Sequence, residues 1–225
     1  MTTPILLAWS GGKDSTLAME RLCKDARWRV AGLVTTVTSG YERIAIHGVR
    51  RSILKRQAAA LGVALIEAEI PPQASNDVYE ASFAQALART REAEPALCDI
   101  AFGDLYLADV RAYREALLAR LGWRGVYPIW GEDTSALARH FVAQGHRAIL
   151  SCVDTQQLDA AFCGRDFDAS LLADLPRSCD PCGENGEFHT CVHASPLFTA
   201  PIPLERGERV LRDGRFQYVD LIEGD

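Results

Sequence analysis

The sequence predicts an α/β fold, with a parallel sheet covered by helices on both faces and a smaller α+β part at the C-terminal end. Through the first half, short apolar runs alternate with segments of helical periodicity, as repeated βα units with right-handed crossovers do. After about residue 128 this alternation weakens, and residues 154–203 are rich in Cys, Asp, Gly and Pro. We therefore expect one domain at residues 1–128 and a second at residues 129–225.

Each element follows from its periodicity and its end signals. In the first helix Leu17, Leu22 and Cys23 lie near one face. The second helix stops at Gly62, where a glycine C-cap is expected, and the third begins at Asn76, a favourable capping residue. The predicted strands are residues 4–9, 30–37, 63–70, 98–103 and 146–153, and the predicted helices are residues 15–25, 50–62, 76–92, 107–122 and 134–145.

The tail of the chain predicts a β-hairpin. Two β-like runs in "ERVLRDGRFQYVDLI" flank Asp213 and Gly214, and an Asp-Gly pair between such runs is a strong hairpin signal.

The composition excludes several classes of protein. Hydrophobic residues make up 48% and charged residues 24%, as in ordinary globular proteins. No apolar run approaches the ~20 residues of a membrane-spanning helix, and the start "MTTPILLAWS" lacks the basic region of a signal peptide. We expect a cytoplasmic protein without a membrane partner. The net charge of -6 argues against a nucleic-acid partner.

The stretch "SGGKDS" joins the first strand to the first helix. It is not a Walker A loop, because Lys13 is followed by Asp14 and only then by a hydroxyl residue. Asp14 beside phosphates would repel them unless it orients Mg²⁺ or caps neighbouring N–H groups.

The same stretch nevertheless suits an anion. Gly11 and Gly12 let the backbone approach a ligand closely, and the first helical turn directs free N–H groups and a favourable dipole at it. Ser10 and Ser15 can add hydrogen bonds and Lys13 a positive charge. The alternative is a plain strand-to-helix turn with a serine cap.

Two further motifs lie where such sheets bind ligands. Gly103 and Asp104 in "FGDLYLADVR" end a predicted strand, at the carboxyl edge where ligands bind; helix capping is the alternative role for Asp104. His47 in "AIHGVRR" precedes a helix and is expected to meet nucleotide or substrate, or else to lie in a solvated polar loop.

The motif "CGENGEFHT" carries acid–base groups. Glu184 and Glu187 lie three apart in a glycine-rich loop that can present carboxylates to a cation or to ammonium. His189 can act as an acid or base, because its ordinary pKa is near neutrality. The sequence does not divide these roles, and an Asn-Gly turn in a surface hairpin is the alternative.

Together these motifs resemble a known family. "SGGKDS" resembles the PP-loop of N-type ATP pyrophosphatases, in the adenine nucleotide alpha hydrolase-like superfamily. With "ERIAIHGVRRSILKRQAAALGV", "FGDLYLADVRAYRE", "YPIWGEDT" and "CGENGEFHT", the chain resembles the diphthine-ammonia ligase family, or diphthamide synthase domain. The resemblance implies a HUP-type sheet with ATP across its carboxyl edge and adenine near the second strand. It also implies a second domain that faces the substrate.

The implied reaction is formation of an amide from a carboxylate and ammonia. ATP is cleaved to AMP and pyrophosphate with Mg²⁺, through an adenylated carboxylate. The carboxylate partner would be diphthine on elongation factor 2 in an archaeon or eukaryote, and a small metabolite in a bacterium; a homodimer is left open. The expected catalytic residues are Lys13, Asp14, Glu184, Glu187 and His189. The expected nucleotide-binding residues are Ser10, Gly11, Gly12, Lys13, Asp14, Ser15, His47, Gly103 and Asp104.

The seven cysteines keep other readings open. Cys179, Cys182, His189 and Cys191 could bind zinc, although Cys182 and His189 lie closer than in familiar zinc fingers. Cys179 and Cys182 also form a CxxC pair, which suits a PP-loop tRNA sulfurtransferase. An ATP-binding regulatory module without catalysis is the third reading. The other cysteines, Cys23, Cys98, Cys152 and Cys163, are expected in the core.

Overall fold

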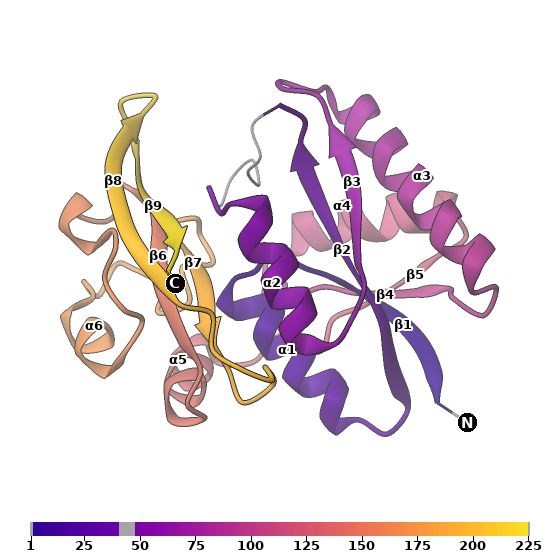
Figure 1. The fold of residues 1–225 in the computed structure, drawn as a ribbon, viewed down its shortest axis with the longest axis horizontal. Helices are drawn as coiled ribbons and strands as arrows, with labels where there is room; N and C mark the ends of the chain where they lie inside the picture. Colours follow the sequence, from indigo (N-terminus) through magenta and orange to yellow (C-terminus); the bar gives the residue numbers. More distant parts are fainter. Residues whose placement is uncertain (1, 41–47, 225) are drawn as a thin grey trace.

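The computed structural model describes residues 2–40 and 48–224 and contains two sheets that lie side by side (Figure 1). The first sheet is parallel, with five strands in the order β3-β2-β1-β4-β5. The second is antiparallel, with four strands in the order β7-β6-β9-β8. The predicted α/β class with a smaller C-terminal α+β part is therefore confirmed.

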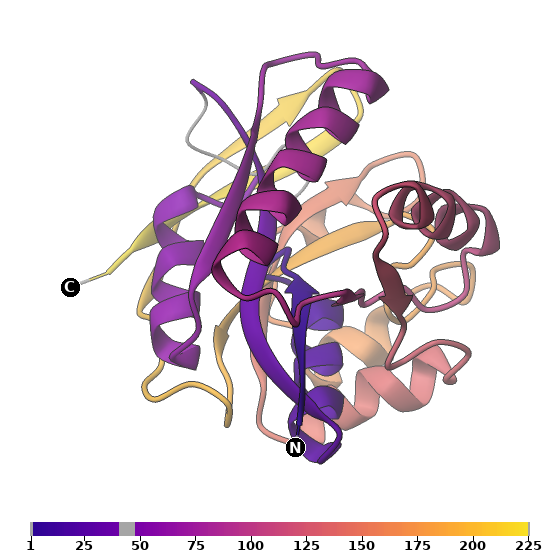
Figure 2. The same ribbon diagram turned by 90° about the vertical axis from the view of Figure 1, so that its right-hand side faces the viewer.

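The first sheet has helices on both faces. Ile5 and Leu7 of β1 pack in the core cluster that contains α1 and α2, whereas Leu6 packs with α3 and α4. In the perpendicular view of Figure 2, α3 and α4 lie towards the viewer and the second sheet lies behind the first. The elements are β1 (Thr3–Ala8), α1 (Lys13–Lys24), β2 (Trp28–Thr38), α2 (Arg51–Leu61), β3 (Leu65–Ile70), α3 (Asn76–Ala93), β4 (Asp99–Ala101), α4 (Ala108–Arg120) and β5 (Arg124–Val126).

The second sheet shares a core with the first. Helices α1 and α2 lie between the two sheets (Figure 1), and one buried cluster joins Leu17 and Ile53 to Ile149, Phe188 and Val219. The expected boundary after residue 128 falls between β5 and α5. The elements are α5 (Thr134–Ala143), β6 (Arg147–Asp154), the 3-10 helix η1 (Ala160–Phe162), α6 (Ala169–Asp174), β7 (Phe188–Ala194), β8 (Leu204–Arg212) and β9 (Phe216–Glu223).

The end signals were mostly informative. Gly62 caps α2 in the left-handed conformation, as expected. Asp213 and Gly214 both have positive φ and turn β8 into β9, which confirms the hairpin. The cap of α3 was assigned one residue late: Ser75 accepts the hydrogen bond from the Val78 N–H.

Two expectations for the described residues were wrong. Cys23 is exposed, because it lies beside Leu22 on α1 but points away from the core. Cys98 is only partly buried, whereas Cys152 and Cys163 are buried as expected.

In the described part of the chain, no helix has the length and apolar character needed to cross a membrane.

Candidate active site

A cavity of about 680 Å³ opens at the carboxyl ends of β1, β2 and β4. Its walls come from both halves of the chain, because residues just before and within β7 face the loop between β1 and α1. The lining residues that bear on chemistry are Ser10, Gly12, Lys13, Asp14, Ser15, Gly103, Asp104, Arg114, Glu184, His189 and Thr190. The cavity thus brings together most of the expected site residues; His47 lies outside the described residues.

Lys13 provides a buried positive charge in the cavity wall. Its ammonium donates to both carboxylate oxygens of Asp14, at 2.7 and 2.8 Å, and lies 5.6 Å from the ring centroid of Phe188. Burial alone would lower the Lys13 pKa, but the charge of Asp14 and its hydrogen bond, together with the nearby Cys182 and Glu184, outweigh burial and raise that pKa. Lys13 is therefore a cation at neutral pH.

The backbone of the loop is held from within and from β7. The Ser15 and Thr16 hydroxyls donate to the Gly12 carbonyl at 2.9 and 3.0 Å. The Lys13 N–H donates to Thr190 Oγ1 at 3.0 Å, and a Cβ on Gly12 would lie 3.0 Å from the Thr190 carbonyl oxygen. The sequence gives no signal for Thr190 beyond its place in "CGENGEFHT".

The end of β4 closes the other side of the loop. A Cβ on Gly103 would lie 2.7 Å from the carbonyl of Asp14, so this position has no room for a side chain. Asp104 pairs with Arg114, whose Nε lies 2.8 Å from Oδ2. The Arg114 guanidinium lies 4.5 Å from the centroid of the Phe102 ring. Arg114 is a cavity cation that the sequence analysis missed.

Glu184 faces the cavity in a partly buried position. Its Oε1 accepts a hydrogen bond from the Leu105 N–H at 2.8 Å. Burial raises its pKa to about 7, and the negative charge of Asp14 adds to that rise. The Glu184 carboxyl can therefore take up or release a proton near neutral pH.

Glu187 has a different environment, although it lies only three residues away. Its side chain is buried and accepts hydrogen bonds from the Asp180 N–H at 2.8 Å and the Asn185 N–H at 3.0 Å. The Asn185 side-chain amide donates a third at 3.1 Å. The Glu187 carboxylate therefore binds the loop that carries Glu184, and Glu187 does not line the cavity.

His189 lines the cavity as a neutral imidazole. Burial, together with the positive charge of Lys13, lowers its pKa to about 4. At neutral pH the ring is uncharged and a weak base, so hydrogen bonding is the chemistry open to it.

The cysteines of the C-terminal half are protonated thiols. Cys179, Cys182 and Cys191 are buried and not disulfide-bonded, and burial raises the pKa of each to about 12. Across the described ranges, no group of three or more His, Cys, Asp or Glu side chains is placed to hold a metal ion. The zinc set suggested by the sequence is therefore not assembled.

One end of the cavity is aromatic and apolar. It is lined by Val34 of β2, Ile70 at the end of β3, and Asn76, Tyr79 and Phe83 of α3. The rings of Tyr79 and Phe83 stack in parallel, with 6.2 Å between their centroids. This end provides flat apolar contacts beside polar groups, which suits a planar heterocycle.

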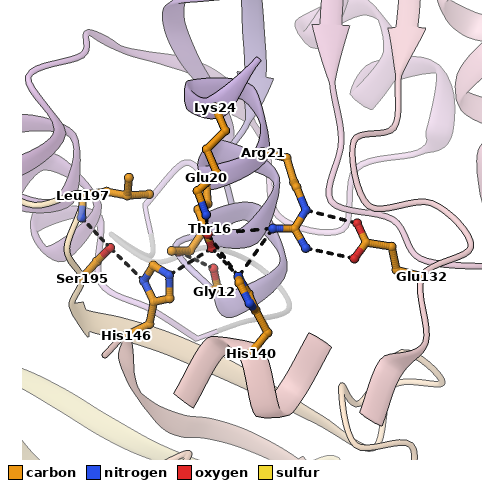
Figure 3. Close-up of polar contacts among 10 residues, drawn as sticks. All are labelled: Gly12, Thr16, Glu20, Arg21, Lys24, Glu132, His140, His146, Ser195 and Leu197. Carbon is orange, nitrogen blue, oxygen red and sulfur yellow. Dashed lines mark hydrogen bonds and ion pairs between the residues drawn. The ribbon is translucent and has the colours of Figure 1, made fainter. Parts of the chain in front are cut away.

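The buried carboxylate of Glu20 on α1 connects this helix to other parts of the chain (Figure 3). Glu20 accepts from Lys24 and contacts His140 Nε2 at 3.0 Å and His146 Nε2 at 3.3 Å. His146 Nδ1 lies 2.9 Å from the Ser195 hydroxyl. Although burial opposes it, these hydrogen bonds lower the Glu20 pKa to about 2. The helix that begins at the loop is thereby tied to α5 and to the second half of the chain.

Comparisons with known proteins bear on both halves. The family model described as the diphthamide synthase N-terminal domain matches residues 3–125, and that of the diphthamide synthase C-terminal domain matches residues 133–220. No curated protein matches. A solved structure described as a predicted subunit of tRNA methyltransferase from Methanocaldococcus jannaschii is 16% identical, with a TM-score of 0.41, covering 88% of this chain and 100% of that chain. Because the two family models together span nearly the whole sequence, the chain belongs to the diphthamide synthase family.

Proposed function

We propose that this protein is an ATP-dependent amide ligase that adenylates a carboxylate, releases pyrophosphate, and then transfers ammonia to release AMP. Membership of the diphthamide synthase family indicates an ATP-using enzyme of the PP-loop type. The proposed amide-forming reaction rests on one observation. The cation Lys13 and the carboxyl group of Glu184, which has a pKa of about 7, line the same cavity.

The lining of the cavity favours one orientation of ATP. Its phosphates would lie against the N-terminus of α1, where Lys13 and the first-turn N–H groups favour negative charge. The adenine would then lie at the aromatic end, between β2 and α3. In this orientation the α-phosphate would lie between the loop that carries Lys13 and the loop that carries Glu184, where an acceptor carboxylate could attack it.

The charges of the cavity favour a metal complex of the nucleotide. Lys13 and Arg114 contribute two positive charges against the carboxyl groups of Asp14, Asp104 and Glu184, and both cations are already paired with carboxylates. The Asp14 side chain is 31% exposed, so it can contribute one ligand to Mg²⁺, which usually binds one or two carboxylates together with phosphates and water. Bound Mg²⁺ would neutralise charge on the pyrophosphate leaving group.

Glu184 is suited to the second half-reaction. Amide formation from ammonium requires protons to leave the nitrogen, and a carboxylate with a pKa of about 7 can accept one near neutral pH. The Leu105 N–H fixes the orientation of this carboxylate, and Glu187 fixes the loop that bears it. His189, as a neutral ring, would donate or accept a hydrogen bond to the acceptor.

The cysteines weigh against a sulfurtransferase. Sulfur transfer requires a thiolate, and a pKa of about 12 leaves Cys179 and Cys182 protonated. The acceptor is accordingly a carboxylate: diphthine on elongation factor 2 in an organism that makes it, and otherwise a small metabolite.

The test is exchange of labelled pyrophosphate into ATP. Adenylation is reversible, so exchange should require a carboxylate acceptor and Mg²⁺ but not ammonium. Each candidate acceptor is added separately, and ammonium is then added to ask whether AMP accumulates. Exchange that needs ammonium, or ADP as the product, would contradict the proposal, and ATP binding without any turnover would favour a regulatory module.

A further inference from the structure

Gln57 is a completely buried glutamine on α2, next to the loop of residues 9–12 that joins β1 to α1. Its side chain makes three hydrogen bonds to parts of the chain that are far apart in sequence. Trp9 Nε1 donates to Gln57 Oε1 at 2.8 Å, and Gln57 Nε2 donates to the carbonyls of Gly11, at 3.0 Å, and Val192, at 2.7 Å. One amide thus connects the end of β1, the loop and β7.

The three partners fix the orientation of this amide. The indole N–H of Trp9 needs an acceptor, and the two carbonyls need donors. A glutamine side chain offers one acceptor and two N–H donors, so only one orientation satisfies all three groups. No charged side chain of similar shape could do the same, since a carboxylate would face two carbonyl oxygens.

The orientation of the Gly11 carbonyl determines the direction of the Gly12 N–H. In a trans peptide the C=O and N–H groups point in opposite directions. The Gly11 carbonyl points to Gln57 and also accepts from the Val192 N–H at 2.9 Å, so the Gly12 N–H points the other way. Gly12 lines the cavity, and within residues 2–40 and 48–224 the one contact of its N–H is a long one, 3.3 Å from the Ser10 hydroxyl.

Without Gln57 the Gly11 carbonyl keeps only the Val192 N–H as a partner among the described residues, so the peptide between the two glycines is held less firmly. Gly11 already has a φ of 76°, and neither glycine has a side chain to oppose rotation of the peptide plane. A Cβ on Gly11 would lie 2.7 Å from Gln57 Oε1, so loop and amide are closely packed.

We propose that Gln57 is a positioning residue for phosphate binding: it holds the Gly11–Gly12 peptide in the orientation that presents the Gly12 N–H to the phosphates. The inference rests on the proposed function, because it assumes that this loop binds the phosphates of ATP. It also gives β7 a part in the site, since Val192 completes the anchor of the loop. Gln57 touches no ligand itself and acts through the loop.

The test compares the affinities of three ligands: ATP, inorganic pyrophosphate and adenosine. Gln57→Leu keeps the size of the side chain and removes all three hydrogen bonds. It should weaken binding of ATP and pyrophosphate by about tenfold or more and leave adenosine affinity unchanged. The control is Leu171→Ala, a core truncation on α6, away from the cavity, which should destabilise the fold without changing any of the three affinities.

The outcomes separate this inference from the proposed function. If the wild-type protein binds neither ATP nor pyrophosphate, the proposed function falls. In the other case the wild-type protein binds both ligands. The positioning role alone then falls if Gln57→Leu binds pyrophosphate as tightly as the wild type, or if its affinity for adenosine drops by the same factor as its affinity for pyrophosphate. Should Gln57→Leu not fold, Trp9→Phe removes the hydrogen bond that orients the amide, together with part of a buried ring that also lines the cavity. This variant should bind pyrophosphate about threefold more weakly and adenosine with unchanged affinity. Unchanged pyrophosphate affinity would overturn the proposal.

Discussion

Glu184 and Glu187 have different surroundings although they come from one short motif. Glu184 contacts the cavity and one backbone N–H, whereas Glu187 is buried and receives three hydrogen bonds from its own loop. Hydrogen bonds from three donors hold the Glu187 side chain against its own loop. Substitution of Glu184 should therefore lower the turnover rate, whereas substitution of Glu187 should first lower the stability of the fold.

Replacement of Glu184 should affect turnover and not nucleotide binding. We expect Glu184→Gln to lower kcat by roughly 100-fold, because general acid–base groups contribute at least that much. The carboxylate form is the active one, so wild-type kcat should rise with pH through about 7. The variant should lack this rise. Rate profiles against pH, with ATP affinity measured separately, check this; an unchanged profile would refute the base role.

Replacement of Glu187 should lower stability first. Glu187→Gln puts an amide NH₂ among N–H donors, and an unsatisfied buried group costs about 1–3 kcal/mol. Thermal unfolding of the variant should show a lower Tm, with kcat restored at temperatures where it is fully folded. A loss of kcat with no change in Tm would place Glu187 in the chemistry instead.

The sequence identified these glutamates but could not assign their roles. Spacing shows that both lie in one glycine-rich loop, whereas burial and hydrogen-bond partners depend on Leu105 and Asp180, which the pattern does not connect to them. Gln57 and Thr190 were missed for the same reason. A buried glutamine within a helical pattern has no local signature, because its partners are distant in sequence.

At the level of elements, α1 links the loop to the rest of the molecule. It begins directly after the loop that follows β1, and two turns later Glu20 ties it to His140 on α5 and to His146 (Figure 3). The buried Glu20 carboxylate therefore stabilises the position of the helix on which the site is built.

Substitution of Glu20 should give a pH-dependent loss of stability. The folded pKa of about 2 lies below the ordinary 4.5, so the stabilisation is complete above about pH 4.5 and is lost as the pH falls towards 2. Near neutral pH, Glu20→Gln should lower the free energy of unfolding by roughly 3 kcal/mol. Urea denaturation of both proteins across this range should show the difference shrinking with acidity; a constant difference would contradict this account.

Periodicity predicted the elements well where each had its own clear pattern. Helices α1 to α5 and strands β1 to β4 and β6 follow their apolar runs to within a few residues. The three-residue β5 is too short for a pattern. β7 was missed because its strand character comes from pairing with β6, whereas its sequence is that of a cysteine-rich loop.

At the scale of the whole molecule, the two halves share a buried core. The faces of α1 and α2 that point away from the first sheet are covered by the second, and β7 supports the loop between β1 and α1. The sequence suggested two domains because composition changes near residue 128, but composition carries no information about which faces pack together.

Separation of the halves should therefore disrupt the first half. A fragment of residues 1–128 would expose Leu17, Ile53 and their neighbours to water and would lack Thr190 and Val192 behind the loop. We expect it to bind hydrophobic dyes and to unfold without a cooperative transition. Cooperative unfolding of this fragment, with ATP affinity equal to that of the full chain, would show that the halves are independent.

The most direct test of the central claim is ³¹P NMR of Mg-ATP incubated with the protein, ammonium and candidate carboxylates. We expect the ATP resonances to be replaced by those of AMP and pyrophosphate, because the proposed reaction breaks the bond between the α- and β-phosphates. Formation of ADP and inorganic phosphate would contradict it.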